Sequence, residues 1–233
     1  MQEIFQFLRE LAANNNREWF QSHRAWYDQV RSQFNEIVKA LLVRISQFDP
    51  TVSHLDVKDC TYRIYRDVRF SQDKSPYKTH LGCYISAKGK QSFHAGYYFH
   101  VQPPSPDTDD QWEGLNGPFM AAGTWYLPSN ILREVRMSIV EDLTTFREIA
   151  EEPRFRKAFP ILGYDRLKTM PKGFPKDFPY PHYLQPRMYA SGCALPVDFF
   201  QAPDWLDQLT RRFESGKPFI DFLNDTIDDY EGV

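Results

Sequence analysis

The chain has 233 residues, of which 42% are hydrophobic, so it is long enough to bury a sizeable core in one large domain. Its 28 Lys and Arg residues against 31 Asp and Glu residues give a net charge of −3. This balance excludes the overall basic character that is typical of nucleic-acid-binding domains, although a local basic patch remains compatible with it.

The N-terminal residues 1–14 include Glu3 and no long apolar run, so we expect no signal peptide. No stretch approaches about 18 consecutive apolar residues, so we expect no membrane span and no membrane partner. Cys60, Cys83 and Cys193 lack the spacing of metal ligands and are odd in number, which suits buried thiols in a reducing compartment. The cytoplasm is therefore the expected location.

The N-terminal quarter predicts helices. Apolar residues recur at helical spacing in residues 4–11, and Asn16 is a suitable N-cap for the following segment. From residue 17 to about residue 48 a stripe of apolar residues keeps a 3.6-residue period, which predicts one long helix that ends at Asp49-Pro50. Its Trp and Phe residues are expected to belong to the core.

The middle of the chain changes to an alternating pattern. Residues 61–68, 81–87, 93–101 and 119–125 are predicted strands. Lys88-Gly89-Lys90 is the predicted turn between the second and third of them, and the polar, proline-rich residues 103–111 are expected to form an exposed loop.

The second half predicts a helix capped by Ser129 that runs to about residue 150, followed by a proline-rich region. A short helix near 153–159, short strands near 187–200, and a last helix from Pro203 that resumes after residues 216–218 complete the chain. We expect a single α+β domain: a mainly antiparallel sheet packed by the long N-terminal helix and the helix near 129–150.

Residues 63–78, called the basic segment below, are the part of the sequence that most strongly indicates a functional site. If residues 61–70 form a strand, Tyr62, Ile64, Val68 and Phe70 share an apolar face, and Arg66 falls on that face. A guanidinium group there needs a carboxylate or a bound anion, because an unpaired buried charge costs several kcal/mol. The sequence is compatible with either partner for Arg66, a carboxylate of the protein or a bound anion.

Ser75-Pro76 favours the start of a short helical turn, since Ser caps helices and Pro suits the first helical position. A helix N-terminus attracts phosphate and carboxylate groups, and guanidinium forks match their oxygens. The predicted anion-binding residues are Arg66, Arg69, Lys74, Ser75, Lys78 and Lys172. The alternative is that these charges pair with Asp67, Asp73 and loop carbonyls and merely hold a turn in place.

The expected hairpin places His100 beside the basic segment. Pairing the apolar residues of 81–85 with those of 95–101 places His100 opposite a residue between Lys78 and His80. A histidine beside an anion site is a candidate general acid or base, with Asp67 as a second proton-handling candidate. The alternative is a hydrogen-bonded structural histidine.

Other motifs are weak. Residues 71–74 and 75–78 match the S-x-x-K pattern of serine acyl-enzymes without the rest of that signature. His94 and His100 lie about 20 Å apart along a strand, too far to share a metal ion, and no glycine-rich phosphate loop or dinucleotide fingerprint is present. We expect neither a metal nor a cofactor. The loop around Lys172 is a second basic segment, and solvated charges are the equal alternative there.

Several motifs together resemble a known family. They are Asn15-x-Arg17-x-Trp19-Phe20, the run 62–71 continuing into 73–79, Tyr97-Tyr98-x-His100, Gly123-x-Trp125, Leu132-x-x-Val135-Arg136 and Leu167-Lys168-x-x-Pro171-Lys172-Gly173-Phe174. Over nearly its whole length the chain is similar to the uncharacterised family called domain of unknown function 2461. The resemblance implies that the anion-binding candidates other than Ser75, together with Asp67 and His100, fall on family motif positions. The resemblance does not imply any particular reaction.

The first functional hypothesis is binding of a phosphorylated or carboxylated small molecule at the basic site, with or without catalysis. The runner-up is a non-enzymatic module that binds nucleic-acid backbone or a partner protein through the same basic patch. The sequence leaves the oligomeric state open.

Overall fold

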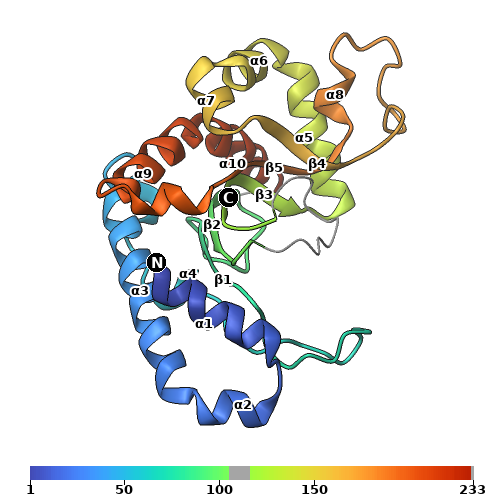
Figure 1. Cartoon of the computed structure of the whole chain (residues 1–233). Coiled ribbons are helices and arrows are strands. Elements are labelled where there is room, and N and C mark those ends of the chain that lie inside the picture. The colour runs from blue at the N-terminus through green and yellow to red at the C-terminus, as the bar shows by residue number, and fades with distance from the viewer. Residues whose placement is uncertain (105–115, 232–233) are drawn as a thin grey trace.

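A computed structural model describes residues 1–104 and 116–231 and shows an α+β fold (Figure 1). The described residues form a five-stranded antiparallel sheet with the strand order β1-β2-β3-β5-β4. Its strands are β1 (Leu81–Ile85), β2 (Gly96–Val101), β3 (Phe119–Tyr126), β4 (Ile161–Arg166) and β5 (Pro186–Ala194).

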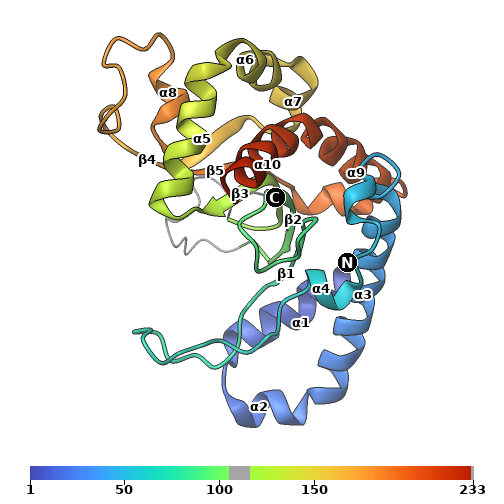
Figure 2. The ribbon, with the colours of Figure 1, turned by 180° about the vertical axis from the view of Figure 1, so that it is seen from behind.

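Helices from both ends of the chain pack against this sheet, as the two opposite views show (Figures 1 and 2). They are α1 (Gln2–Ala13), α2 (Arg17–Ser22), α3 (Arg24–Ile45), α4 (Val57–Cys60), α5 (Ser129–Glu141), α6 (Leu143–Glu151), α7 (Pro153–Ala158), α8 (Pro181–Leu184), α9 (Trp205–Ser215) and α10 (Lys217–Glu231), with 3-10 turns η1 (Pro50–Val52) and η2 (Val197–Gln201). None of the helices in this described part of the chain is both long and apolar enough to cross a lipid bilayer.

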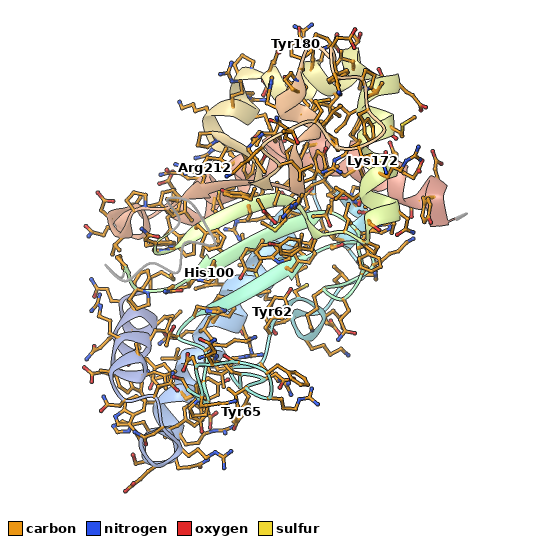
Figure 3. All side chains as sticks on the ribbon, turned by 90° about the vertical axis from the view of Figure 1, so that its right-hand side faces the viewer. Tyr62, Tyr65, His100, Lys172, Tyr180 and Arg212 are labelled. Atoms are coloured by element: carbon orange, nitrogen blue, oxygen red, sulfur yellow. The ribbon has the colours of Figure 1, made fainter. Side chains whose placement is uncertain are left out.

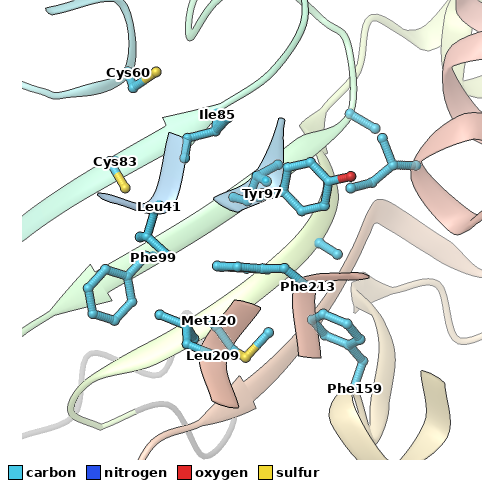
Figure 4. Close-up of a cluster of buried hydrophobic side chains, with 14 of the residues drawn as sticks. Leu41, Cys60, Cys83, Ile85, Tyr97, Phe99, Met120, Phe159, Leu209 and Phe213 are labelled. Atoms are coloured by element: carbon cyan, nitrogen blue, oxygen red, sulfur yellow. The ribbon is translucent and has the colours of Figure 1, made fainter. Parts of the chain in front are cut away.

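One face of the sheet carries the main core. In the β1–β2 hairpin Cys83 pairs with Phe99 and Ile85 with Tyr97, so all four side chains point to the same side. There they meet α3, α9 and α10, and Tyr97 packs edge-on against Phe213 with ring centroids 5.5 Å apart (Figure 4). Each fully buried side chain of this kind stabilises the fold by about 1.5–3 kcal/mol. The predicted apolar face of the hairpin is confirmed.

The predicted long helix is interrupted at His23. The imidazole Nδ1 lies 2.8 Å from the carbonyl oxygen of Trp19, and the ring stacks on the Trp19 indole at 4.1 Å. The chain turns there, so α2 and α3 are separate helices. The cap predicted upstream is correct, because Asn16 accepts a hydrogen bond from the Trp19 N–H at 2.9 Å.

Other expectations need correction. Ser129 begins α5 but makes no capping bond, and Asp142 divides the predicted helix by accepting from the Thr145 N–H at 3.2 Å. The turn expected at Lys88-Gly89-Lys90 is a longer loop that bends twice, at residues 86–89 and 89–92. The proline-rich region contains β4, which the alternation did not reveal. The loop predicted at residues 103–111 lies almost entirely outside the described residues.

The strand expected at residues 61–68 is absent. Only two isolated bridges occur in its neighbourhood, between Thr61 and Cys83 and between Tyr65 and Tyr77. The basic segment instead folds back on itself and projects from the body of the protein, away from the helices that cover the core (Figures 1 and 2).

Candidate functional site

The basic segment is a narrow antiparallel arm. The Arg66 N–H donates to the Pro76 carbonyl at 3.0 Å, and the Lys78 N–H donates to the Ile64 carbonyl at 2.8 Å. These two bonds close a loop whose outer residues are mostly exposed, and Phe70 is 97% exposed. The arm therefore carries its charges into solvent rather than onto a buried strand face.

Both arginines predicted to hold an anion have carboxylate partners inside the arm. Arg66 forms an ion pair with Asp73, and Arg69 forms one with Asp67 at 2.6 Å. Hydrogen bonds from Arg69 hold the pKa of Asp67 down at about 2, and bonds from Ser75 and Arg66 hold the pKa of Asp73 well below its usual range. The arm thus contains the local charge network that the sequence left as the alternative.

Ser75 and Lys74 also bond within the arm. The Ser75 N–H and hydroxyl both donate to Oδ1 of Asp73, at 2.8 and 2.6 Å, and the Lys74 ammonium donates to the Val68 carbonyl at 3.0 Å. No helix begins at Ser75-Pro76, so the predicted helix N-terminus is wrong. The Asp73 carboxylate accepts a hydrogen bond from the Ser75 N–H, which the first turn of a helix would have left free for an anion.

The base of the arm is fixed to the body by side chains from the N-terminal helices. The Asn15 amide donates to the Tyr77 carbonyl at 2.9 Å and accepts from the Tyr77 N–H at 3.1 Å. The Tyr77 ring stacks on Phe20 with centroids 4.0 Å apart, and Arg31 donates to the Tyr62 carbonyl at 2.8 Å. Lys78, next to the clamped Tyr77, is therefore held at a defined place.

Lys78 lines a cavity of 320 Å³ where the arm meets the open side of the sheet. We call it the aromatic cavity, because six of its eleven lining residues are aromatic; Figure 3 labels Tyr62 beside the strands. Its lining comprises Tyr62, Lys78, His80, Tyr84, Lys90, Ser92, Phe93, Tyr98, Thr124, Trp125 and Tyr126. These described residues include two lysines and no Asp or Glu.

Lys78 is half-buried, and its ammonium nitrogen lies 5.4 Å from the centroid of the Tyr62 ring. Burial lowers its pKa from the ordinary value, and the nearby Arg63 charge lowers it further. In residues 1–104 and 116–231 no carboxylate pairs with it. An ammonium group in this position gains most from an anion that enters the cavity.

The expected position of His100, opposite a residue between Lys78 and His80, is wrong by at least two residues, since its partner on β1 is Gly82. The longer loop between the strands shifts the pairing. His100 nevertheless reaches the start of the hairpin, because its ring lies 4.5 Å from that of His80. Burial lowers the pKa of His100 to about 3 and that of His80 to about 4, so both rings are neutral at neutral pH.

His100 is bonded on both sides of its ring. The Tyr98 hydroxyl lies 3.0 Å from Nδ1, and Nε2 lies 3.1 Å from Oε1 of Gln102. The ring also stacks on Phe119 at 4.5 Å. This pattern matches a neutral imidazole with its proton on Nε2, which positions the Tyr98 ring over the cavity. By contrast, within the described ranges His80 has no hydrogen-bond partner and keeps its nitrogens available to the cavity it lines.

The predicted residues are only partly brought together. Arg66, Asp67, Arg69, Lys74 and Ser75 share the arm, and Lys78 joins the arm to the cavity. Asp67 and His100 contact separate sets of residues. Lys172 is exposed in the loop before α8, and Figure 3 shows it on the other side of the sheet strands from Tyr65, which belongs to the arm.

Sequence reasoning missed most of the cavity lining. Tyr84 and Tyr98 alternate with the core residues of β1 and β2, and their pairing places both on the open face. That alternation was the available signal. Lys90 gave none, because it reaches the cavity from a loop, and Trp125, at the end of β3, was marked only by its place in the Gly123-x-Trp125 motif.

The comparisons agree with the motif pattern. Residues 3–222 match the family described as "Conserved hypothetical protein (DUF2461)". Neither the curated proteins nor the solved structures contain a match to the chain. Because the match spans nearly all of the sequence, the chain belongs to the DUF2461 family of conserved hypothetical proteins.

Proposed function

We propose that this protein binds a small molecule with a phosphate or carboxylate group in the aromatic cavity, with Lys78 as the principal contact to the anion. The observation that carries the proposal is the half-buried Lys78 ammonium, which faces a cavity without a carboxylate partner among the described residues. Lys90 is the second cation of the lining.

The arm has a supporting part in the proposal. Arg66 and Arg69 are paired with Asp73 and Asp67, so these two arginines hold the shape of the arm. Lys78 lacks such neutralisation, which makes it the better anchor for an anion. Arg66, Arg69, Lys74, Ser75 and Lys172 stay predictions as direct contacts.

The test is a thermal-shift titration with inorganic phosphate, acetate and citrate at constant ionic strength. Lys78→Met keeps the aliphatic stem and removes the charge, and Lys39→Met makes the same change at an exposed position on α3 away from the cavity. We expect at least one anion to raise the Tm of the wild type and of Lys39→Met but not of Lys78→Met. Equal shifts in all three proteins would refute the assignment.

A second candidate function is binding of nucleic-acid backbone by the outer part of the arm. It is favoured by Phe70, which is 97% exposed and lies 6.0 Å from the Arg69 guanidinium carbon, because an exposed ring beside a cation suits base stacking. Steeply salt-dependent binding of a single-stranded oligonucleotide that Phe70→Ser and Arg69→Ala both weaken is the expected result. Binding that ignores both substitutions would exclude the arm as the contact.

The cytoplasm is the location we propose. Cys60, Cys83 and Cys193 are free thiols, and a reducing compartment preserves such thiols. Fractionation of cells that express the full chain tests this location.

A further inference from the structure

We infer that the ligand of the aromatic cavity carries a planar aromatic ring in addition to its anionic group. The inference rests on the proposed function and narrows its ligand class to aryl phosphates, aryl carboxylates and mononucleotides. It follows from three properties of the lining. Aromatic rings make up most of its surface, several of its polar side chains are already hydrogen-bonded within the protein, and aromatic side chains are exposed at its mouth.

Rings make up most of the available surface. Tyr62, Tyr84 and Tyr98 lie toward the arm and the hairpin, while Phe93 and Trp125 come from the loop before β2 and from the end of β3. Tyr98 packs against Trp125 at a centroid distance of 6.1 Å with a tilt of 58°. Tilted rings at this spacing leave aromatic faces and edges for a further ring, and aromatic pairs add about 0.5–1.5 kcal/mol beyond their buried area.

The hydroxyl groups of Tyr84 and Tyr98 are already occupied. The Tyr84 oxygen lies 2.7 Å from the His94 carbonyl and 2.8 Å from the Gly123 carbonyl, and the Tyr98 hydroxyl is bonded to His100. Burial keeps the pKa of both hydroxyls above the usual value, so neither ionises. A ligand therefore meets their rings rather than their oxygens.

The small polar side chains of the lining are occupied in the same way. Thr124 donates to the Phe93 carbonyl at 2.8 Å, and Ser92 donates to the Gly89 carbonyl at 2.9 Å. Among the described lining residues, the polar groups left for a ligand are the Lys78 ammonium, the neutral His80 imidazole and the Tyr62 hydroxyl. The Lys90 ammonium, which also donates to the Lys58 carbonyl, adds a second cation. A sugar or a polyol, which needs many hydrogen bonds per ring, fits this lining poorly.

The mouth of the cavity exposes aromatic surface. Phe93 and Trp125 are each 42% exposed, and the neighbouring Tyr126 is 58% exposed. Exposed apolar residues that gather at one cavity are typical of a ligand site, whereas scattered ones are not. The volume of 320 Å³ lies near the lower end of small-molecule sites and suits one ring system with its anionic substituent.

The experiment compares probes that differ only in the ring. Phenyl phosphate and cyclohexyl phosphate carry the same anion and a similar apolar area, but only the phenyl ring is planar and aromatic. Inorganic phosphate supplies the anion alone. Adenosine monophosphate compared with ribose 5-phosphate tests whether the ring of a nucleotide is recognised. Benzoate compared with acetate tests the same for a simple aryl carboxylate. Affinities are measured by isothermal titration calorimetry at constant ionic strength.

We expect phenyl phosphate to bind about three- to tenfold more tightly than cyclohexyl phosphate, in the range that aromatic pairing provides. Trp125→Leu is expected to remove most of this difference between the two probes. Trp125→Phe keeps a ring and is expected to retain most of it. Phe93→Leu repeats the test from a separate segment if Trp125→Leu fails to fold.

The outcomes separate this inference from the proposed function. Lys78-dependent binding with equal affinities for phenyl and cyclohexyl phosphate overturns the ring inference and leaves the anion site standing. A difference between the probes that survives both Trp125→Leu and Phe93→Leu also overturns it. Absence of Lys78-dependent binding with every probe overturns the proposed function, and the inference fails with it.

Discussion

The two neighbouring histidines under the cavity make the stability of the fold depend on pH in a specific window. His80 and His100 lie with ring centroids 4.5 Å apart, and their pKa values are lowered to about 4 and about 3, first by burial. The charges of Lys78 and Arg66 oppose protonation of His80, and Gln102 favours it slightly at His100. Protonation of either ring is therefore costly in the folded state.

The direction of the effect follows from proton binding. An unfolded histidine takes up its proton near pH 6.5, whereas these two do so only near pH 4 or below when folded. Between these values the unfolded state binds more protons, so stability is complete above about pH 6.5 and is lost as the pH falls toward 4. Each such histidine contributes a slope of about 1.4 kcal/mol per pH unit in that window.

His100→Gln is the perturbation that isolates one histidine. Glutamine can accept from the Tyr98 hydroxyl and cannot be protonated, so the variant keeps a polar partner there and loses the titration. Urea unfolding at pH values from 7 to 5 should give the wild type a mean slope that is steeper by about 1 kcal/mol per pH unit than that of His100→Gln. The same slope in both proteins would show that His100 titrates normally in the folded state and would refute the reasoning.

Three further predictions concern single positions. Asn15→Ala removes both hydrogen bonds to the Tyr77 backbone and should cost about 1–3 kcal/mol in urea unfolding and weaken phosphate binding; unchanged phosphate affinity would show that the clamp does not position the cavity cation. Gly123→Ala should destabilise the protein by more than about 2 kcal/mol, because φ is +120° and the added Cβ would lie 2.1 Å from the Tyr189 carbonyl oxygen; a neutral result would mean that β3 and β5 can separate there. Phe70→Ser should change unfolding by less than about 0.5 kcal/mol because the ring is 97% exposed, and a larger loss would reveal packing of the arm.

Regular hydrophobic periodicity predicted much of the fold. The helices at the N-terminus, the β1–β2 hairpin and the final helices follow patterns that reflect burial of one face. The break at His23 was hidden, since it depends on a side chain that bonds to the backbone rather than on a change of period. β4 was hidden as well, because it is a short edge strand within a proline-rich stretch.

The candidate site was predictable only where charge gathers in sequence. The basic segment was found, but the expected strand at residues 61–68 was wrong because its backbone pairs within itself, through Arg66 with Pro76 and Lys78 with Ile64. The aromatic cavity draws on four separate stretches of chain. Its assembly depends on long-range packing, which no local pattern in a single sequence encodes.

The Asn15–Tyr77 clamp joins residues 62 positions apart, whereas the ion pairs of the arm join residues two and seven positions apart. Closing a short loop costs less chain entropy than closing a long one, so we expect the arm to take shape before it docks onto the N-terminal helices. The cavity would then be completed in one of the later steps of folding. A nascent chain would pass through a stage in which the arm is formed and the ligand site is not.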